Sequence, residues 1–176
     1  SNFIKQCPIY TGSGILNSIA KIIKNKLPNV KKIAIVADQK LPQRLITKLK
    51  LSLKKYDLKI YKLNSKDKIK NITIAIRLIE DLIKNNFNRS DCIISFGGGV
   101  LSDLSAFVSS VTKRGIKFVN IPTTLLAQVD ASIGGKTAIN SIQGKNLIGT
   151  FYQPEFIITD IALLNTLPNR EMISGY

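Results

Sequence analysis

Short apolar runs of strand length alternate with longer apolar stripes of helical spacing over the first 120 residues, and this alternation narrows the possible folds more than any other feature. The strand-like runs cover residues 7–11, 33–37, 58–63 and 92–96. The helical stripes cover residues 15–27 (after the capping candidate Ser13), 42–55 and 69–86. Strands joined through helices pair in parallel, so the sequence predicts an α/β fold with a doubly wound, mostly parallel sheet.

The length and the residue types that are missing restrict the function. A chain of 176 residues is long enough for one domain with a buried core, and we expect residues 1–176 to form one domain. The apolar stretches are too short to span a bilayer and no signal peptide begins the chain, so we expect no membrane partner. Because there is no His, the sequence excludes Ser–His and Cys–His nucleophile pairs and imidazole-bound metals.

The cysteines and the charge bear on location and partners. Cys7 and Cys92 are interpreted as reduced, buried thiols of a cytoplasmic protein, with a lone disulfide as the alternative. The formal net charge is +15, but 16 of the 21 Lys fall within residues 1–70 as singles and pairs, and Arg occurs only five times. We attribute the lysine excess to A/T-rich codon usage and expect these side chains to lie on solvated helix faces. We therefore expect no nucleic-acid partner. A nucleic-acid patch and a general attraction for anionic substrates are the alternatives.

Three glycines follow the strand-like run at 92–96. Gly97 to Gly99 allow a sharp turn and a close backbone approach to a ligand, and the helix after them directs free N–H groups outward, which favours a pyrophosphate. The dinucleotide pattern G-x-G-x-x-G fails at Ser102, so a simple tight turn remains possible. Asp103 is expected in the first helical turn, as a helix cap or a cofactor contact.

The end of this helix and the segment after it are the remaining candidates. Lys113-Arg114-Gly115 is typical of a helix C-terminus, although Arg114 could instead clamp a phosphate. Helix periodicity fades over residues 122–149, where we expect a long irregular functional segment or, alternatively, a solvated loop. A P-loop is excluded there because Asp130 occupies the position of its first glycine. The polar side chains of this segment are Thr123, Thr124, Gln128, Asp130, Lys136, Asn140, Lys145 and Asn146.

The run from Gly97 to Glu171 closely resembles the 3-dehydroquinate synthase family. The most specific part is "PTTLLAQVDASIGGKT" followed by "GKN", and the upstream "CPIYTGSGIL" and the strand ending at Asp38 are looser matches. The resemblance implies a Rossmann-like N-terminal domain and a lyase of the shikimate pathway, which leads to chorismate and the aromatic amino acids. Such an enzyme converts 3-deoxy-D-arabino-heptulosonate 7-phosphate to 3-dehydroquinate and phosphate, and it oxidises and re-reduces the substrate with tightly held NAD.

The resemblance also assigns residues to NAD and to the phosphorylated sugar acid. The implied cofactor contacts are Asp38, Asp67, Lys70, Gly98, Gly99, Val100, Leu101, Ser102, Asp103, Thr123, Thr124, Lys136, Lys145, Leu163, Leu164, Asn165 and Thr166. The implied substrate contacts are Asp130, Lys136 and Asn146, with Arg114 reaching the phosphate across a homodimer interface.

This sequence also departs from the family pattern. Ser102 and Ala106 stand where the family usually has Gly, so we expect weakened NAD binding. Lys66 and Asp67 replace the Gly and Glu of the family's acidic segment.

The family's metal site lies beyond what this sequence contains. The resemblance implies a divalent metal, zinc or cobalt, held by a glutamate soon after "LPNRE" and by two histidines of a C-terminal all-helical domain. With no His and an end at Tyr176, we expect the NAD-binding domain alone, no metal ligands, and no synthase activity of this polypeptide by itself. The alternatives are a sister sugar-phosphate cyclase, a glycerol-type dehydrogenase, or a non-catalytic dinucleotide-binding remnant.

Overall fold

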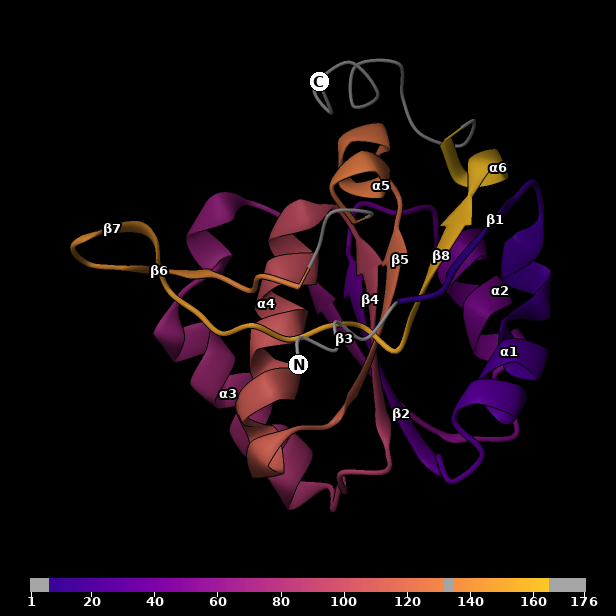
Figure 1. Ribbon diagram of the computed structural model, residues 1–176, viewed down its shortest axis with the longest axis horizontal. Coiled ribbons are helices and arrows are strands. Elements are labelled where there is room, and N and C mark those ends of the chain that lie inside the picture. Colours follow the sequence, from indigo (N-terminus) through magenta and orange to yellow (C-terminus); the bar gives the residue numbers. More distant parts are fainter. Residues whose placement is uncertain (1–6, 132–134, 165–176) are drawn as a thin grey trace, which may run out of the picture.

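A six-stranded parallel sheet forms the centre of the computed structural model, which describes residues 7–131 and 135–164, without the side chain of Asp67 (Figure 1). The strands lie in the order β1-β8-β5-β4-β2-β3, and every pair is parallel. Their bounds are β1 Ile9–Gly12, β2 Lys32–Asp38, β3 Asp57–Leu63, β4 Cys92–Gly97, β5 Lys117–Pro122 and β8 Phe156–Asp160.

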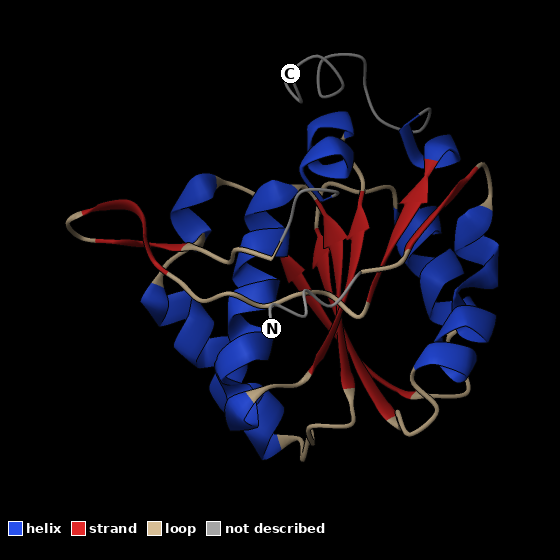
Figure 2. Ribbon diagram, viewed as in Figure 1, coloured by secondary structure: helices blue, strands red, loops and turns tan. Residues whose placement is uncertain are grey.

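Helices cover both faces of this sheet, which confirms the predicted doubly wound α/β fold (Figure 2). On one face lie η1 (Ile15–Ser18), α1 (Ile19–Lys26) and α2 (Gln43–Ser52), whose apolar stripes pack into one core. On the other face lie α3 (Ile72–Lys84) and α4 (Gly99–Val111), which form a second core. The remaining helices are η2 (Asp67–Ile69), η3 (Thr112–Arg114), α5 (Leu125–Ala131) and α6 (Ile161–Leu164).

The helices that follow two neighbouring strands, β2 and β4, lie on opposite faces of the sheet, and this arrangement positions the candidate site. β2 continues into α2 on one face, whereas its neighbour β4 continues into α4 on the other face. The loops that leave these two strands therefore diverge, and ligands of open α/β sheets bind at such a switch point, at the carboxyl ends of the strands. Asp38 ends β2 and Gly97 ends β4, so both residues lie at this point.

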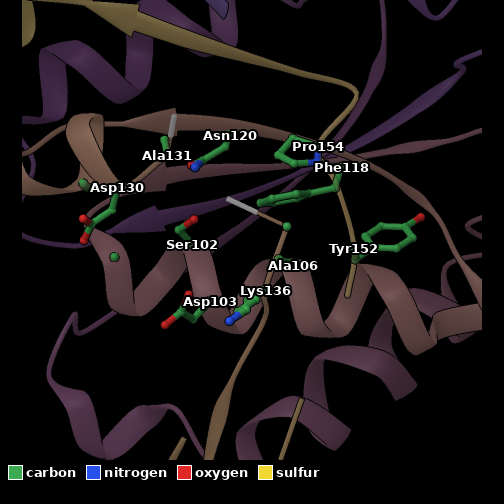
Figure 3. A pocket seen from close by; sticks show the side chains of 13 residues that line it. Ser102, Asp103, Ala106, Phe118, Asn120, Asp130, Ala131, Lys136, Tyr152 and Pro154 are labelled. Atoms are coloured by element: carbon green, nitrogen blue, oxygen red, sulfur yellow. The ribbon is translucent and has the colours of Figure 1, made fainter. Parts of the chain in front are cut away.

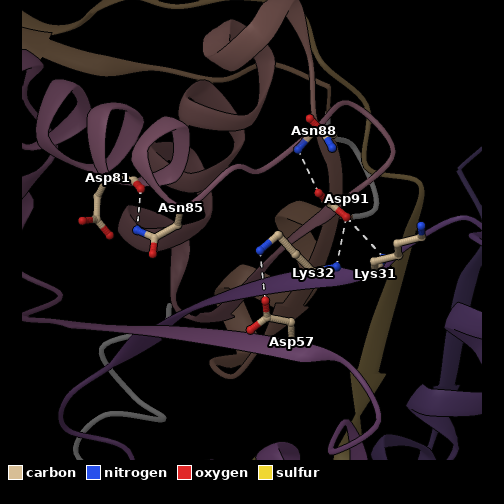
Figure 4. A network of polar contacts seen from close by, with 7 residues as sticks. All are labelled: Lys31, Lys32, Asp57, Asp81, Asn85, Asn88 and Asp91. Carbon is tan, nitrogen blue, oxygen red and sulfur yellow. Dashed lines mark hydrogen bonds and ion pairs between the residues drawn. The ribbon is translucent and has the colours of Figure 1, made fainter.

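A buried carboxylate aligns the opposite ends of the same strands (Figure 4). Asp91 is 3% exposed and accepts hydrogen bonds from the backbone N–H groups of Lys32 at 2.9 Å, Lys31 at 3.2 Å and Asn88 at 2.8 Å. These bonds join the start of β2 to the start of β4, so Asp91 helps to hold the two strands in register.

Several local predictions were wrong. Ser13 does not cap a helix, because Gly14 precedes η1 with φ 79° and Ser18 precedes α1 without a side-chain cap. The helix predicted at 69–86 is confirmed by α3, but its start was wrong: Ile69 ends η2, and α3 begins at Ile72. The Asn71 side chain caps α3 by accepting from the Ile74 N–H at 3.0 Å.

The segment predicted to be irregular, residues 122–149, contains α5 and an antiparallel hairpin of β6 (Ile139–Ser141) and β7 (Gly144–Ile148). These elements lack an apolar pattern because they bury little. Within α5 only Ala127 is buried, and Ile142 and Leu147 of the hairpin are exposed.

The cysteines fit the prediction in part. Neither cysteine is part of a disulfide bond in the described structure, which overturns the disulfide alternative; Cys92 is buried, but Cys7 is only half-buried. None of the described helices is long and apolar enough to cross a membrane.

Candidate active site

The glycine turn at the end of β4 brings α4 against the end of β2. A Cβ at Gly97 would lie 2.6 Å from Leu101 Cδ1 and 3.3 Å from Asp38 Cβ, so a side chain there would require the Leu101 side chain and Asp38 to shift. A Cβ at Gly99, in contrast, would meet no described atom within 4 Å, so the first turn of α4 faces open space. Free N–H groups at a helix start beside open space suit an anion such as a pyrophosphate.

Two cavities adjoin this turn and share Gly99, Ala127 and Asp130. The larger, of about 370 Å³, is also lined by Asp38, Ser65 and Thr124, and we call it the Asp38 cavity. The smaller, of about 140 Å³, lies between α4 and β5, and we call it the Asn120 cavity. Its lining includes Ser102, Asp103, Phe118, Asn120, Lys136 and Tyr152 (Figure 3). A ligand that crosses the glycine turn would therefore have one cavity on each side.

Lys70 forms an ion pair with Asp103, a residue of α4. Lys70 Nζ lies 2.9 Å from Asp103 Oδ2, and the Lys70 side chain is 5% exposed against 37% for Asp103. Asp103 stands one residue beyond the first turn of α4, so the predicted position was wrong and helix capping is excluded as its role. The backbone N–H of Asn140 donates to the Lys70 carbonyl oxygen, so the β6–β7 hairpin is bonded to the same residue that forms the ion pair.

The threonines after β5 hold the local backbone. The N–H of Thr123 donates to the Gly97 carbonyl oxygen at 2.9 Å, which ties β5 to the glycine turn. Thr124 Oγ1 accepts from the Ala127 N–H at 3.1 Å and so caps α5, while Thr124 also faces the Asp38 cavity. Asp130 at the end of α5 and Lys136 are exposed side chains that line the Asn120 cavity.

Tyr152 closes the far side of the Asn120 cavity as a neutral group. Its hydroxyl donates to the Ile116 carbonyl oxygen at 2.5 Å. Burial raises the pKa of Tyr152, the charge of Glu155 raises this pKa further, and Arg89 opposes both effects. The hydroxyl proton is therefore bound by a backbone carbonyl oxygen, and the Tyr152 side chain forms a wall of the cavity.

Several implied site residues lie away from both cavities. Arg114 follows α4, and this 13-residue helix, about 20 Å long, separates it from the glycine turn. Lys145 and Asn146 belong to the hairpin, which projects beyond α3 (Figure 1). Leu163 and Leu164 lie on α6, with Leu163 in the core. Asn165, Thr166 and the Asp67 side chain lie outside the described part of the chain.

Sequence reasoning missed some lining residues. Lys40 and Ser65 reach the Asp38 cavity, and Phe118, Asn120 and Tyr152 reach the Asn120 cavity. For Asn120 a signal was present, because an amide within the apolar run of β5 is unusual for a buried strand. The two departures from the family pattern, Ser102 and Ala106, also line the Asn120 cavity, and their effect on NAD binding stays a prediction.

A family model described as "3-dehydroquinate synthase N-terminal" matches residues 60–174. The chain belongs to the 3-dehydroquinate synthase family. It is 45% identical over 172 residues to the 3-dehydroquinate synthase of Pelagibacter ubique, with 98% of this chain and 47% of that protein covered. It is 44% identical over 171 residues to that of Dictyoglomus thermophilum, with 97% and 46% covered. The chain thus spans about half the length of these curated relatives.

Solved structures agree with the predicted fold. The crystal structure of a 2-deoxy-scyllo-inosose synthase, complexed with carbaglucose-6-phosphate, NAD+ and Co2+, matches with a TM-score of 0.88 at 26% identity and covers 98% of this chain and 47% of that one. A 2-epi-5-epi-valiolone synthase from Streptomyces hygroscopicus, with NAD+ and Zn2+ bound, matches with a TM-score of 0.85 at 22% identity, over 99% and 48% of the two chains. At this identity, the second likeness concerns the fold alone.

The described residues fit NAD better than they fit a metal. The open face at Gly99, the two adjoining cavities and the carboxylate of Asp38 at the end of β2 match the parts of a dinucleotide. No three His, Cys, Asp or Glu residues gather closely enough in the described ranges to hold a metal ion.

Proposed function

We propose that residues 1–176 form the NAD-binding domain of a 3-dehydroquinate synthase, which converts 3-deoxy-D-arabino-heptulosonate 7-phosphate to 3-dehydroquinate and phosphate. The observation that carries this proposal is the open glycine turn at the switch point, in a chain of this family. When bound, NAD would supply reversible hydride transfer: the carbon that bears a ring hydroxyl would give up its hydride to NAD+ while the hydroxyl loses its proton, which leaves a ketone, and the hydride would later be returned. The first turn of α4 binds the pyrophosphate, and the Asp38 carboxylate accepts hydrogen bonds from the adenosine ribose.

Charged side chains at the mouth of the Asn120 cavity are proposed to handle the substrate. Asp130 and Lys136 line this cavity and lie at the solvent side, where a phosphorylated sugar acid enters. The Lys136 ammonium group offers charge stabilisation to an oxyanion, and Asp130 orients a substrate hydroxyl. The divalent metal of the proposed whole enzyme, zinc or cobalt, is not assigned to the described residues.

We further propose that the enzyme is a cytoplasmic homodimer. Arg114 lies at the opposite end of α4 from the glycine turn, and the family resemblance places it on a substrate phosphate across a subunit interface. Asn146 in the projecting hairpin is likewise remote from the Asn120 cavity. Sedimentation velocity tests the dimer, and phosphate release from the heptulosonate phosphate tests the expectation that this 176-residue polypeptide has no turnover alone.

The glycine turn provides a direct test of NAD binding. Gly99→Ala adds a methyl group into the space assigned to the pyrophosphate, and no described protein atom lies within 4 Å of it. Since Ala favours helices, the melting temperature should stay the same or rise. The Kd for NAD, measured by calorimetry, should increase about tenfold or more, which corresponds to the loss of about one charge-assisted hydrogen bond.

Gly12→Ala is the matched control, because Gly12 lies outside both cavities and its added Cβ would only contact Ile15 Cβ at 3.9 Å. This variant should bind NAD like the unaltered protein. Equal NAD affinity of Gly99→Ala and Gly12→Ala would reject the assignment of the pyrophosphate to this turn.

A sister sugar-phosphate cyclase is the second candidate, favoured by the likeness to the 2-deoxy-scyllo-inosose synthase. Titration of the NAD-saturated protein with the heptulosonate phosphate and with carbaglucose-6-phosphate separates the two. We expect tighter binding of the heptulosonate phosphate, and preference for carbaglucose-6-phosphate would favour the sister enzyme.

A further inference from the structure

The Asn120 side chain lines the smaller cavity and carries a buried amide oxygen that has no hydrogen-bond partner among the described residues. Asn120 is 4% exposed, and its Oδ1 atom is buried without a hydrogen-bond partner among the described residues. The residue lines the Asn120 cavity from β5, and its amide end points toward the side where Ser102 and Asp130 lie (Figure 3). A buried carbonyl oxygen without a partner is costly to a folded protein, so its retention calls for an explanation.

The neighbours of Asn120 do not supply this explanation. Ser95 pairs with Asn120 in the β4–β5 register and therefore lies on the same face of the sheet. Yet Ser95 Oγ is itself buried without a partner in the described structure, so the two side chains do not satisfy each other. The amide is thus not part of a polar network that holds β4 and β5 together.

The chemistry of the cavity indicates what the amide binds. Asn120 is the one amide side chain among the described residues that line it, and the charged Asp130 and Lys136 stand at its exposed side. Phe118, two residues earlier on the same strand face, adds an aromatic wall. A ligand group that fits is planar and neutral and carries an N–H donor for Oδ1 and an oxygen acceptor for Nδ2.

We propose that Asn120 binds the carboxamide of the nicotinamide ring through paired amide hydrogen bonds, an inference that rests on the proposed binding of NAD. With the pyrophosphate at the first turn of α4 and the adenosine half in the Asp38 cavity, the nicotinamide half extends past Gly99 into the Asn120 cavity. The cavity of about 140 Å³ accommodates a ring of this size. Asn120 thereby fixes which edge of the ring faces β5, and so which face of the ring is open to the substrate.

Binding of three dinucleotides to three forms of the protein tests this role. The ligands are NAD, 3-acetylpyridine adenine dinucleotide, which has a methyl group in place of the carboxamide NH2, and ADP-ribose, which has no nicotinamide. The forms are the unaltered protein, Asn120→Leu and Asn120→Asp, the latter because it retains the side-chain shape. Ser105→Ala is the matched control, since Ser105 Oγ is also buried and unpartnered in the described structure but lines neither cavity.

The unaltered protein should bind NAD about tenfold more tightly than the acetylpyridine analogue, as expected for one lost hydrogen bond that leaves a buried acceptor unpaired. Asn120→Leu and Asn120→Asp should each weaken NAD binding about tenfold, and Asn120→Leu should no longer distinguish NAD from the analogue. ADP-ribose affinity should be the same in every form, and Ser105→Ala should behave like the unaltered protein.

Equal losses of NAD and ADP-ribose affinity in the Asn120 variants would overturn the proposal, because they would indicate a structural role. Equal affinity of the unaltered protein for NAD and the analogue would overturn it without any variant. If the unaltered protein bound neither NAD nor ADP-ribose, the proposed function itself would fail, and this inference with it.

Discussion

Lys70 places an ammonium group in the interior, and Asp103 provides the carboxylate beside it. The Lys70 side chain is 5% exposed, whereas Asp103 keeps 37% of its side-chain surface in contact with solvent. The two partners therefore depend on the pair to different extents, because an unpaired buried charge is much more costly than a charge that water can solvate.

This asymmetry predicts unequal effects of the two single substitutions. Asp103→Asn leaves a buried ammonium group without its carboxylate and should lower the free energy of unfolding by about 2 kcal/mol. Lys70→Met leaves a carboxylate that water reaches, so this substitution should lower the free energy of unfolding by less than Asp103→Asn does. Urea denaturation measures both, and a larger loss for Lys70→Met would contradict the prediction. Asp57→Asn, which breaks the more exposed pair of Lys32 and Asp57, should cost less than about 1 kcal/mol.

At the scale of elements, the β6–β7 hairpin depends on a small polar junction at its base. Thr137 Oγ1 and Thr150 Oγ1 lie 2.9 Å apart, and Thr150 Oγ1 lies 2.8 Å from Ser110 Oγ of α4. The backbone N–H of Thr137 also donates to the Thr150 carbonyl oxygen at 2.9 Å. These contacts join both arms of the hairpin to α4, the helix that begins at the glycine turn.

The junction requires a glycine at position 149, and a larger residue there should break the contacts between Thr137 and Thr150. A Cβ at Gly149 would lie 2.0 Å from the Thr137 carbonyl oxygen, which is a backbone atom that cannot move aside by itself. Gly149→Ala should therefore destabilise the protein by about 1–3 kcal/mol and increase amide hydrogen exchange at Thr137 and Thr150.

Gly144→Ala, at the other end of β7, would only approach the flexible side chain of Leu147, at 3.1 Å. This matched control should leave hydrogen exchange at the hairpin base unchanged. If the two variants had equal effects on exchange at Thr137, steric closure at Gly149 would not be the cause.

At the scale of the whole molecule, the buried Cys92 thiol links stability to pH. Burial raises the pKa of Cys92, and the charges of Glu155 and Asp91 raise it further. In the unfolded chain the pKa of a thiol is about 8.5. Above that pH the unfolded chain releases a proton that the folded protein keeps, so stability is lost as the pH rises.

We therefore expect the free energy of unfolding to fall with a limiting slope of about 1.4 kcal/mol per pH unit from this thiol once the pH exceeds about 9. Urea denaturation at a series of alkaline pH values measures the slope. Cys92→Ala should flatten it and Cys7→Ala should not, since Cys7 is only half-buried. Identical slopes for these two variants would show that another group controls the alkaline transition. Tyr61, whose pKa is also raised by burial and by its hydrogen bond to Asp81, adds its own effect at higher pH.

The residues that could be predicted for the site share a local cause. Asp38 and the glycines at 97–99 follow buried strands, so their place at one edge of the sheet follows from the strand pattern alone. Asn120 could not be assigned in this way, because its role depends on which groups from α4, α5 and β4 surround it. The position of Arg114 relative to the glycine turn could likewise not be predicted, because it depends on the length and direction of α4.

The sequence by itself determined the α/β class, the strand-to-helix glycine turn and the membership of the 3-dehydroquinate synthase family, because hydrophobic period, turn chemistry and motif text are properties of neighbouring residues. Only the tertiary structure decided that β8 lies between β1 and β5, that Lys70 pairs with Asp103, and that the Asn120 amide faces a cavity. These features join residues far apart in the chain, and their energies depend on burial and on partners that arise only when the sheet and its helices have packed.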